Sequence, residues 1–335
     1  MKALMIEQAT GPSAAVLVDT PEPSPAKGEV CIRLQAASLN HRELWISRGL
    51  YPGMRLPTIL GADGSGIIES VGEGVGPEGI GAEVVLYPGL NWGSGENVPG
   101  ETFGLLGMPG PGTIAERICV PAENVFPKPP HLNFLEAAAL PVAALTAYRA
   151  LVVKAALGAG EHVLVTGIGG GVATFAMLFA LALRAEVSVT SGSPEKLEKA
   201  RSLGASHVFD YRDPDWGKKL RSTGGVDVVM DGSPAAAFAA YGRSLRPGAR
   251  VLIYGSTAGT AFQVSAPDLF LRHASIIGTA MGSPSDFGAM LDFVARHRIV
   301  PVIDRVFGLS EAAEAMDYLD RSHGMGKVLV EMRPL

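Results

Sequence analysis

A glycine-rich segment near the middle of the chain has the composition of a phosphate-binding turn. The apolar run 163–165, with a β-branched valine at each end, leads into residues 167–171, four of which are glycine, and an apolar segment follows over 173–183. This order predicts a strand, a tight turn and a helix, because glycine permits positive φ and lets a ligand approach the backbone. The helix would direct unpaired N–H groups and the positive end of its dipole at a phosphate. The backbone donors expected at this site are those of Gly170, Gly171 and Val172.

The spacing of these glycines departs from the G-x-G-x-x-G of dinucleotide-binding folds. Gly167, Gly169 and Val172 occupy that frame, whereas the frame of Gly167, Gly170 and Ala173 puts a small residue at the contact between helix and strand. A glycine-rich turn that binds nothing is the alternative interpretation. The elements around the turn distinguish the two, since the motif requires a strand before it and a helix after it.

Alternating strand-like and helix-like segments surround the turn, from residue 160 to residue 281. The predicted strands are 163–165, 187–190, 208–209, 226–230, 251–254 and 276–277. The predicted helices are 172–183, 194–203, 215–223 and 235–245. Repeated βα units predict a parallel sheet covered on both faces. Six strands with a glycine turn after the first predict a doubly wound, dinucleotide-binding domain, which we place at residues 125–281.

The first 124 residues have a different pattern. Short alternating runs at 30–34, 66–71 and 82–86 are separated by Gly/Pro turns, which is typical of an all-β, barrel-like domain. Residues 282–335 are too few for a third domain, so we expect them to return to the first, which would comprise 1–124 and 282–335. The returning segment contains a predicted helix at 286–297, a strand at 302–307, a helix after 310 and a strand at 327–331.

Composition argues against several classes of protein. The 335-residue chain has a formal net charge of −5 and no basic tract, so nucleic acid is not expected as a partner. Apolar runs stay shorter than the roughly 18 residues of a membrane span. Residues 1–7 are too short and too soon acidic for a signal peptide, so we expect a cytoplasmic protein. Cys31 and Cys119 lie far apart in the sequence, which predicts neither a disulfide framework nor a cysteine-rich zinc site.

Four segments carry recognisable motifs in a fixed order. They are 39–51 (LNHRELWISRGLY), 61–72 (GADGSGIIESVG), 145–148 (LTAY) and 324–329 (GMGKVL). Together they resemble the medium-chain dehydrogenase/reductase family, and the first resembles its quinone oxidoreductase branch. The resemblance implies an α/β fold, in which a Rossmann doubly wound parallel sheet accompanies a β-rich GroES-like barrel domain. It also implies a homodimer, in which the strand within 274–280 pairs with its copy across a two-fold axis.

The departures from this family concern zinc. Its zinc-dependent alcohol dehydrogenases bind the catalytic metal through a Cys, a His and a third Cys or acidic residue. Asn40 and Ala62 stand where the first two ligands would be, and residues 140–142 hold no third. Residues 91–100 stand where a lobe with four cysteines would be, and contain none. A carboxamide and a methyl group cannot replace thiolate and imidazole on Zn²⁺, so the resemblance implies a zinc-free member. We expect Asp63 to be a buried hydrogen-bond partner rather than a metal ligand.

The end of the predicted second strand determines which nicotinamide cofactor the resemblance implies. NAD-specific sites usually place a carboxylate there for the ribose 2′-hydroxyl, but residues 189–193 contain no acid. Gly192 and Lys196 match the G-x-x-x-K by which quinone oxidoreductases seat NADPH, and Tyr211 matches a tyrosine that borders the adenosine pocket. We therefore expect NADP(H). The alternatives are that Lys196 is a solvated helix residue, and that Glu195 faces the pocket and disfavours a phosphate.

Further cofactor contacts are expected from three segments. The resemblance implies that Thr146 bonds near the nicotinamide ribose. Gly255, Ser256 and Thr257 follow a predicted strand at the carboxyl end of the sheet, where ligands bind in such folds. An equal alternative is that the hydroxyls of Ser256 and Thr257 form hydrogen bonds within the turn itself. Lys327 is expected to reach the cofactor from the returning segment, and a surface lysine is the alternative.

The chemistry expected of a metal-free site is reduction of a conjugated substrate. Alcohol oxidation lacks the metal that would stabilise an alkoxide, whereas hydride added to a quinone or an α,β-unsaturated carbonyl spreads its charge onto oxygen. Asn40 and Tyr51 are the expected hydrogen-bond donors to this small-molecule substrate, and Tyr51 or water supplies the proton. The alternatives are that Asn40 only caps a turn and Tyr51 only packs. Two other functions stay open: an alcohol dehydrogenase-like enzyme with an atypical metal, and a non-catalytic NADPH-binding protein.

Overall fold

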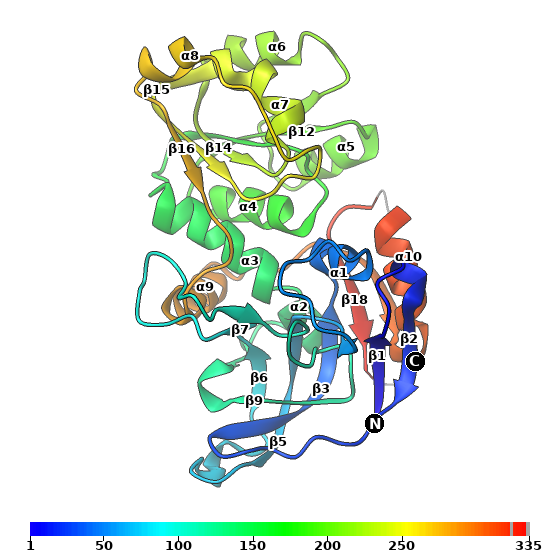
Figure 1. Ribbon diagram of the computed structural model, residues 1–335. Helices are drawn as coiled ribbons and strands as arrows, with labels where there is room; N and C mark the ends of the chain where they lie inside the picture. The colour runs from blue at the N-terminus through cyan, green and yellow to red at the C-terminus, as the bar shows by residue number, and fades with distance from the viewer. Residues whose placement is uncertain (322–323, 333–335) are drawn as a thin grey trace. The chain divides into compact units, whose positions relative to one another are not determined.

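The chain folds into two units. The computed structural model describes residues 1–321 and 324–332 (Figure 1). Unit 1 comprises Met1–Leu145, Gly282–His323 and Lys327–Leu335, and unit 2 comprises Thr146–Met281 and Gly324–Gly326. The sequence places the first division at 124/125, but residues 125–145 belong to unit 1, where β10 (Val125–Pro127) pairs with β6 (Glu83–Leu86). Residues 322–323 and 333–335 of the predicted returning segment lie outside the described residues.

Unit 2 is built on a six-stranded parallel sheet in the order β13-β12-β11-β14-β15-β16. Its strands are β11 (His162–Val165), β12 (Glu186–Ser191), β13 (His207–Asp210), β14 (Val226–Asp231), β15 (Leu245–Ile253) and β16 (Ser275–Gly278). Its helices are α4 (Gly171–Ala182), α5 (Pro194–Ser202), α6 (Trp216–Ser222), α7 (Pro234–Tyr241) and α8 (Ala266–Phe270), and a π-helical segment spans Arg149–Lys154. The strand order reverses beside β11, which confirms the predicted Rossmann sheet.

Burial on both faces explains the apolar strands of unit 2. Val163, Leu164 and Val165 are fully buried in β11, as expected for a central parallel strand between two layers of helices. Helix α4, which follows β11 directly, buries Phe175 and Phe179. The glycine turn therefore connects two rigid, buried elements, and its position is fixed by them.

Unit 1 is β-rich, and strands from its N-terminal part and from the returning segment share one sheet. That sheet has the order β10-β6-β5-β3-β18-β17, with β9 also paired to β3, and β2-β1-β4 and β7-β8 form smaller sheets. The remaining strands are β1 (Lys2–Ile6), β2 (Ala15–Asp19), β3 (Glu29–Ser38), β4 (Thr58–Ile59), β5 (Asp63–Val71), β7 (Gly89–Leu90), β8 (Gly104–Leu105), β9 (Arg117–Pro121), β17 (Ile303–Gly308) and β18 (Lys327–Glu331). The helices are α1 (His41–Ser47), α2 (Phe134–Ala138), α3 (Pro141–Tyr148), which contains the division between the units, α9 (Pro284–His297) and α10 (Ala312–Arg321). The returning segment thus joins the first sheet, as the sequence predicts.

The two cysteines, far apart in the sequence, face each other in this sheet. Cys31 of β3 is the register partner of Cys119 of β9. Leu34 N donates to Glu116 O, which makes Leu34 and Glu116 a hydrogen-bonded pair of this antiparallel ladder. Pairs alternate along the ladder, so Cys31 and Cys119 form a non-hydrogen-bonded pair. In such a pair the two side chains lie on the same face and the two Cα atoms are at the shorter of the two spacings. Both thiols are free. Burial raises the pKa of Cys119 to about 12, which makes it a poor nucleophile.

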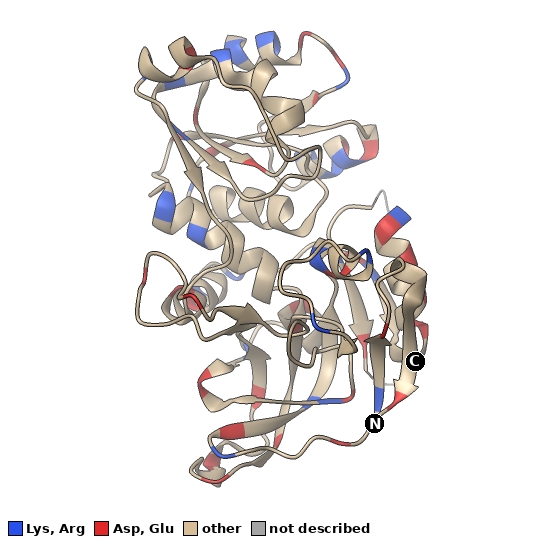
Figure 2. Ribbon diagram, in the orientation of Figure 1, with Lys and Arg blue, Asp and Glu red and all other residues tan. Residues whose placement is uncertain are grey.

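Charged side chains are distributed over both units. Lys and Arg are interspersed with Asp and Glu in both units, and the sequence contains no long basic tract (Figure 2). Within residues 1–321 and 324–332, no helix has the length and apolar character needed to cross a membrane.

Candidate active site

The glycine turn of unit 2 has the backbone geometry that its sequence predicts. After β11, Gly167 and Gly169 take φ of +63° and +153°, which side-chain-bearing residues rarely adopt, and α4 begins at Gly171. A Cβ on Gly169 would lie 2.9 Å from Nζ of Lys196. Lys196 therefore reaches the turn from α5. Gly326 N–H donates to the Gly169 carbonyl (2.9 Å), so residues 324–326, which belong to unit 2, also contact the turn.

Gly192 and Tyr211 are brought together at the ends of β12 and β13. A Cβ on Gly192 would lie 2.8 Å from the Tyr211 hydroxyl, so the ring lies against the glycine backbone. Ser193 caps α5 by accepting from Lys196 N (3.3 Å), and Glu195 is exposed and accepts from Ser193 Oγ (2.5 Å). This hydrogen bond lowers the pKa of Glu195, so a negative charge stays near this strand end. Gly192, Tyr211 and Lys196 therefore lie together around the end of β12 and the glycine turn.

A buried carboxylate that sequence reasoning missed stands beside the glycine turn. Asp231, the last residue of β14, accepts from Thr166 Oγ1 (2.7 Å), from Ser233 N (2.8 Å) and from the Tyr241 hydroxyl (2.8 Å). Burial, followed by the charge of Asp231, raises the pKa of Tyr241 and keeps its hydroxyl as a donor. The signal was present: a polar Asp-Gly-Ser follows the apolar strand, at the carboxyl edge where ligands bind.

The hydroxyl of Thr257 is used within its own turn. Thr257 Oγ1 donates to the Gly232 carbonyl (2.8 Å) and accepts from Ser233 Oγ (3.1 Å), while Ser256 is exposed. Gly255 packs against Gly232, since a Cβ there would lie 3.2 Å from the Gly232 carbonyl oxygen. These contacts favour the local role for Thr257 and leave Ser256 available. Thr146, the remaining residue that we predict to contact the cofactor in this unit, is buried on α3.

Unit 1 holds a polar cluster where three strands meet. β3 ends at Ser38, β5 begins at Asp63, and Ser38 pairs with Asp63 in the ladder. Asp63 is fully buried and accepts four hydrogen bonds. Its Oδ2 accepts from Ser38 Oγ (2.8 Å), Asn40 Nδ2 (2.9 Å) and Lys327 Nζ (3.1 Å), and its Oδ1 accepts from Val142 N (2.9 Å). Asp63 is therefore the buried partner that the sequence predicts. We call Ser38, Asn40, Asp63 and Lys327 the Asp63 cluster.

Lys327 is buried in this cluster, which excludes the surface position that was its alternative. Its side chain is 3% exposed, and Nζ donates to Leu39 O (2.8 Å), Asn40 Oδ1 (2.5 Å) and Asp63 Oδ2 (3.1 Å). An ammonium has three hydrogens, so these contacts use all of them. They favour an internal role for Lys327 over the predicted contact with the cofactor.

Asn40 is the N-cap residue of α1 and is tied to the helix through its backbone. Asn40 N donates to Glu43 Oε2 (2.7 Å), and Glu43 Oε1 accepts from Arg42 Nη1 (2.9 Å), which also donates to Leu106 O (2.9 Å). Burial raises the pKa of Glu43, while the Arg42 guanidinium opposes that rise. The Arg42 guanidinium lies 4.9 Å from the Tyr51 ring centre, which places Tyr51 beside α1. The structure thus brings Asn40 and Lys327 together and holds Tyr51 on the neighbouring Arg42.

The residues of the Asp63 cluster do not fit the zinc of the related alcohol dehydrogenases. Ala62 is fully buried and offers no donor, and Asn40 Oδ1 accepts from an ammonium. A cation already bonded to the carboxamide repels a second one. In the described part of the chain, no three His, Cys, Asp or Glu side chains gather as metal ligands would.

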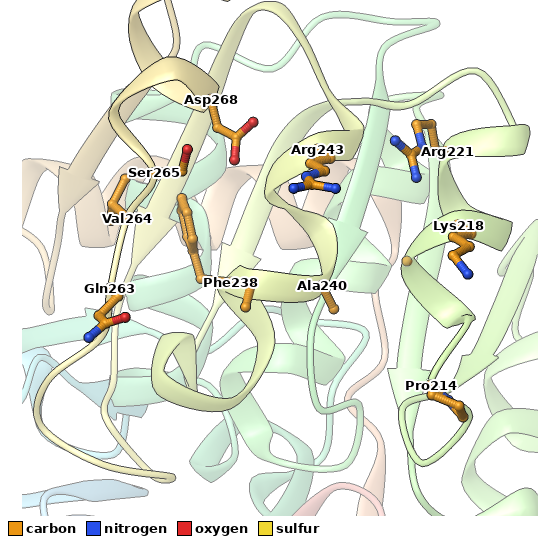
Figure 3. Close-up of a pocket in the computed structure, with 12 residues that line it drawn as sticks. Pro214, Lys218, Arg221, Phe238, Ala240, Arg243, Gln263, Val264, Ser265 and Asp268 are labelled. Atoms are coloured by element: carbon orange, nitrogen blue, oxygen red, sulfur yellow. The ribbon is translucent and has the colours of Figure 1, made fainter.

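A cavity of about 500 Å³ opens elsewhere in unit 2, between α6, α7 and α8. Figure 3 shows Lys218 and Arg221 on one side and Asp268 on the other, with Phe238 and Arg243 between them. None of the residues predicted to bind the cofactor lines it. The cavity therefore takes no part in the candidate site.

Comparisons with known proteins agree with this architecture. Residues 26–130 match the family described as alcohol dehydrogenase GroES-like domain, and residues 171–296 match the family described as zinc-binding dehydrogenase. A zinc-type alcohol dehydrogenase-like protein of Schizosaccharomyces pombe is 37% identical over 321 residues, which cover 91% of either chain. The quinone oxidoreductase of Mus musculus is 30% identical over 340 residues, covering 98% of this chain and 96% of the mouse protein.

A solved structure is similar along the whole chain. The crystal structure of an NAD-dependent alcohol dehydrogenase superposes with a TM-score of 0.93 at 37% identity, and the match covers 99% of this chain and all of that chain. The fold, the order of the two units and these relatives lead to one conclusion: the chain is an oxidoreductase that belongs to the medium-chain dehydrogenase/reductase superfamily.

Proposed function

We propose that the chain is an NADP(H)-dependent, zinc-independent oxidoreductase that transfers hydride to a quinone or an α,β-unsaturated carbonyl. The observation that carries the proposal is the Lys327 ammonium, bonded to Asn40 and Asp63 next to buried Ala62. An internal cation in this position opposes a metal ion and leaves hydrogen bonding as the means of stabilising negative charge. The similarity to the mouse quinone oxidoreductase supports this substrate class.

The choice of NADP(H) over NAD(H) rests on the residues around the end of β12. Lys196 offers an ammonium at the glycine turn, and residues 189–193 place no carboxylate where a ribose 2′-hydroxyl would be held. The similar solved structure is that of an NAD-dependent alcohol dehydrogenase, so the binding of NADPH and NADH to this chain is the direct test of the choice. A bound nicotinamide supplies the hydride, and this chain's residues bind and orient the reactants.

The proposed substrate donors are Asn40 and Tyr51, both in the α1 region of unit 1. Asn40 donates an N–H to the oxygen on which charge accumulates as hydride arrives, while Tyr51 or water returns the proton. No covalent intermediate is needed, because the substrate gains a hydride and a proton and the cofactor is oxidised. The cytoplasmic location expected from the sequence stays a prediction.

Purified protein is expected to oxidise NADPH in the presence of a small quinone or enone, and to do so at the same rate with and without a metal chelator. The measurement is the fall in nicotinamide absorbance, with NADPH and NADH run side by side. The control is a saturated alcohol with the oxidised cofactors, which should give little turnover. Stoichiometric zinc together with chelator-sensitive alcohol oxidation would establish the alcohol dehydrogenase-like alternative. Tight NADPH binding without turnover over the panel would establish the non-catalytic one.

We also propose that the chain forms a homodimer through the edge of the unit 2 sheet. β16 is the last strand of the described order, and Ile276 on it is 36% exposed. Phe270 and Leu271, just before β16 in the chain, are 62% and 71% exposed, which is unusual for large apolar side chains. An unprotected strand edge with apolar neighbours is suited to pairing with a second copy.

Substituting Ile276→Lys is expected to convert the dimer into a monomer, since charge on an edge strand opposes pairing. Light scattering after gel filtration should move from about twice the chain mass to the 34.9 kDa of one chain. The matched control is Ile80→Lys, an exposed apolar residue of unit 1, which should leave the mass of the wild type. A wild-type mass of a single chain at micromolar concentration contradicts the proposal.

A further inference from the structure

We propose that Lys327 and Asp63 are positioning residues that lock the side-chain amide of Asn40 in one orientation, so that a single N–H is left for the substrate. The inference rests on the proposed function, because it assigns the origin of that donor. It starts from the Asp63 cluster, in which Asn40 is held at both ends of its carboxamide. Nζ of Lys327 lies 2.5 Å from Oδ1, and Oδ2 of Asp63 lies 2.9 Å from Nδ2.

The orientation follows from chemistry. An ammonium only donates hydrogen bonds, and a carboxylate only accepts them. The amide of Asn40 must therefore present its oxygen to Lys327 and its nitrogen to Asp63, and a flipped amide would lose both contacts. Asn side chains are often ambiguous in this respect, but two neighbours of opposite character remove the ambiguity here.

The neighbours of Asn40 are themselves fixed. Lys327 also donates to the backbone carbonyl of Leu39, and Asp63 accepts from the backbone of Val142 and from Ser38. Both ionic groups are buried, with side chains 3% and 0% exposed. Buried groups that are fully hydrogen-bonded in a low dielectric have few alternative arrangements. The Asn40 amide, which is bonded to two of them, is therefore restricted to one orientation.

The locked amide has one donor remaining. Nδ2 carries two hydrogens, and Asp63 takes one of them. Lys327 has used all three of its hydrogens, so it cannot donate to a substrate and acts through Asn40 instead. Its charge next to Oδ1 polarises the amide and strengthens the remaining N–H as a donor. A donor that is oriented before the reaction stabilises developing charge without reorganisation.

The kcat values of single and double variants test this proposal, because two residues that act through one group have non-additive effects. Asn40→Ala is expected to lower kcat about 100-fold, in the range seen when one such donor is removed. Lys327→Met is expected to lower kcat about tenfold, with the KM for NADPH unchanged, and Lys327→Arg to recover part of the loss. In the Asn40→Ala background, Lys327→Met should add no further loss, because Lys327 acts only through the amide. Independent, multiplying losses would overturn the proposal.

Lys128→Met is the matched control for burial of a lysine. Lys128 is 7% exposed, pairs with Glu83 (3.2 Å) and belongs to unit 1, but it does not contact Asn40. Its loss should lower the unfolding temperature without changing kcat. If Lys327→Met and Lys128→Met change kcat and stability alike, Lys327 is only structural.

A second readout does not depend on turnover, so it separates this inference from the proposed function. The side-chain amides of a selectively ¹⁵N-asparagine-labelled protein can be followed by NMR; the asparagines are Asn40, Asn91, Asn97, Asn124 and Asn133. The Asn40 pair, assigned from its disappearance in Asn40→Ala, should include one hydrogen that exchanges slowly with water, because Asp63 accepts it. Lys327→Met should shift that pair and speed the exchange of this hydrogen, and spare the other asparagines. An Asn40 pair unaffected by Lys327→Met overturns the inference, whereas a locked pair without activity on any substrate refutes only the proposed function.

Discussion

Asp63→Ala is expected to cost unit 1 about 3–5 kcal/mol of unfolding free energy, which is the range for removing one partner of a buried ion pair. The substitution deletes an acceptor of four hydrogen bonds and leaves the Lys327 ammonium buried without a counter-charge. The unpaired ammonium draws water into the cluster or forces the surrounding residues apart, and either response is costly. The loss also frees the N-terminal turn of α3 from its bond to Asp63.

Urea unfolding followed by tryptophan fluorescence measures this loss in the correct unit. The tryptophans are Trp45 and Trp92 in unit 1 and Trp216 in unit 2, so a Trp216→Phe background reports unit 1 alone. Glu73→Ala is the control, because the Lys27–Glu73 pair has both side chains 77% exposed. Its removal should leave the midpoint unchanged, since exposed pairs contribute little.

Removing both charges together should restore much of the stability that Asp63→Ala loses. In the double variant Asp63→Ala with Lys327→Met, no buried charge is left unpaired, and paired apolar replacements of this kind are often close to neutral. A midpoint shift for Asp63→Ala no larger than that of Glu73→Ala would show that the Asp63–Lys327 pair is not buried in solution.

The Rossmann sheet was predictable because its signals are local. Each predicted strand of unit 2 has a counterpart, since buried parallel strands read as short apolar runs, and the turn at 167–171 is marked by its glycines. The ends of the predicted helices and strands agree less well with the structure than their positions do. The predicted helix 235–245 ends at Tyr241, because Leu245 already pairs with Val226 as the start of β15. That pairing depends on the sheet and leaves no trace in the helix-like sequence.

The Asp63 cluster was predictable only in part, because its contacts are long-range. Asp63 and Lys327 lie 264 residues apart, and no local pattern connects them. The resemblance marked Asn40 and Ala62 as positions without the zinc ligands of the related enzymes. It did not predict that Lys327 bonds to Asn40 and Asp63 there. Cys31 and Cys119 illustrate the same limit, since only the register of β3 and β9 sets them opposite. Asp231 had a local signal that sequence reasoning passed over.

Lys196→Ala is expected to weaken NADPH binding about 10- to 100-fold while changing NADH binding less than about threefold. A charged hydrogen bond to a phosphate contributes about 1.5–3 kcal/mol, and every 1.4 kcal/mol is a tenfold change in affinity. This proposed role is supported by the approach of Lys196 to Gly169 and by the Ser193 cap of α5, which fixes the helix start beside the turn. NADH lacks the 2′-phosphate and so loses nothing specific to the ammonium.

Fluorescence titration of the two reduced cofactors measures both affinities in one experiment. Lys199→Ala on the same helix is the matched control, because Lys199 is exposed and should leave both dissociation constants unchanged. Lys196→Glu should reverse the preference in favour of NADH, since a carboxylate repels the 2′-phosphate. Added salt should weaken NADPH binding to the wild type more than to Lys196→Ala, because salt screens the charge pair. Equal losses for NADPH and NADH in Lys196→Ala would instead place the ammonium at a part common to both cofactors, and the selectivity for NADP(H) would then have to come from other residues of unit 2.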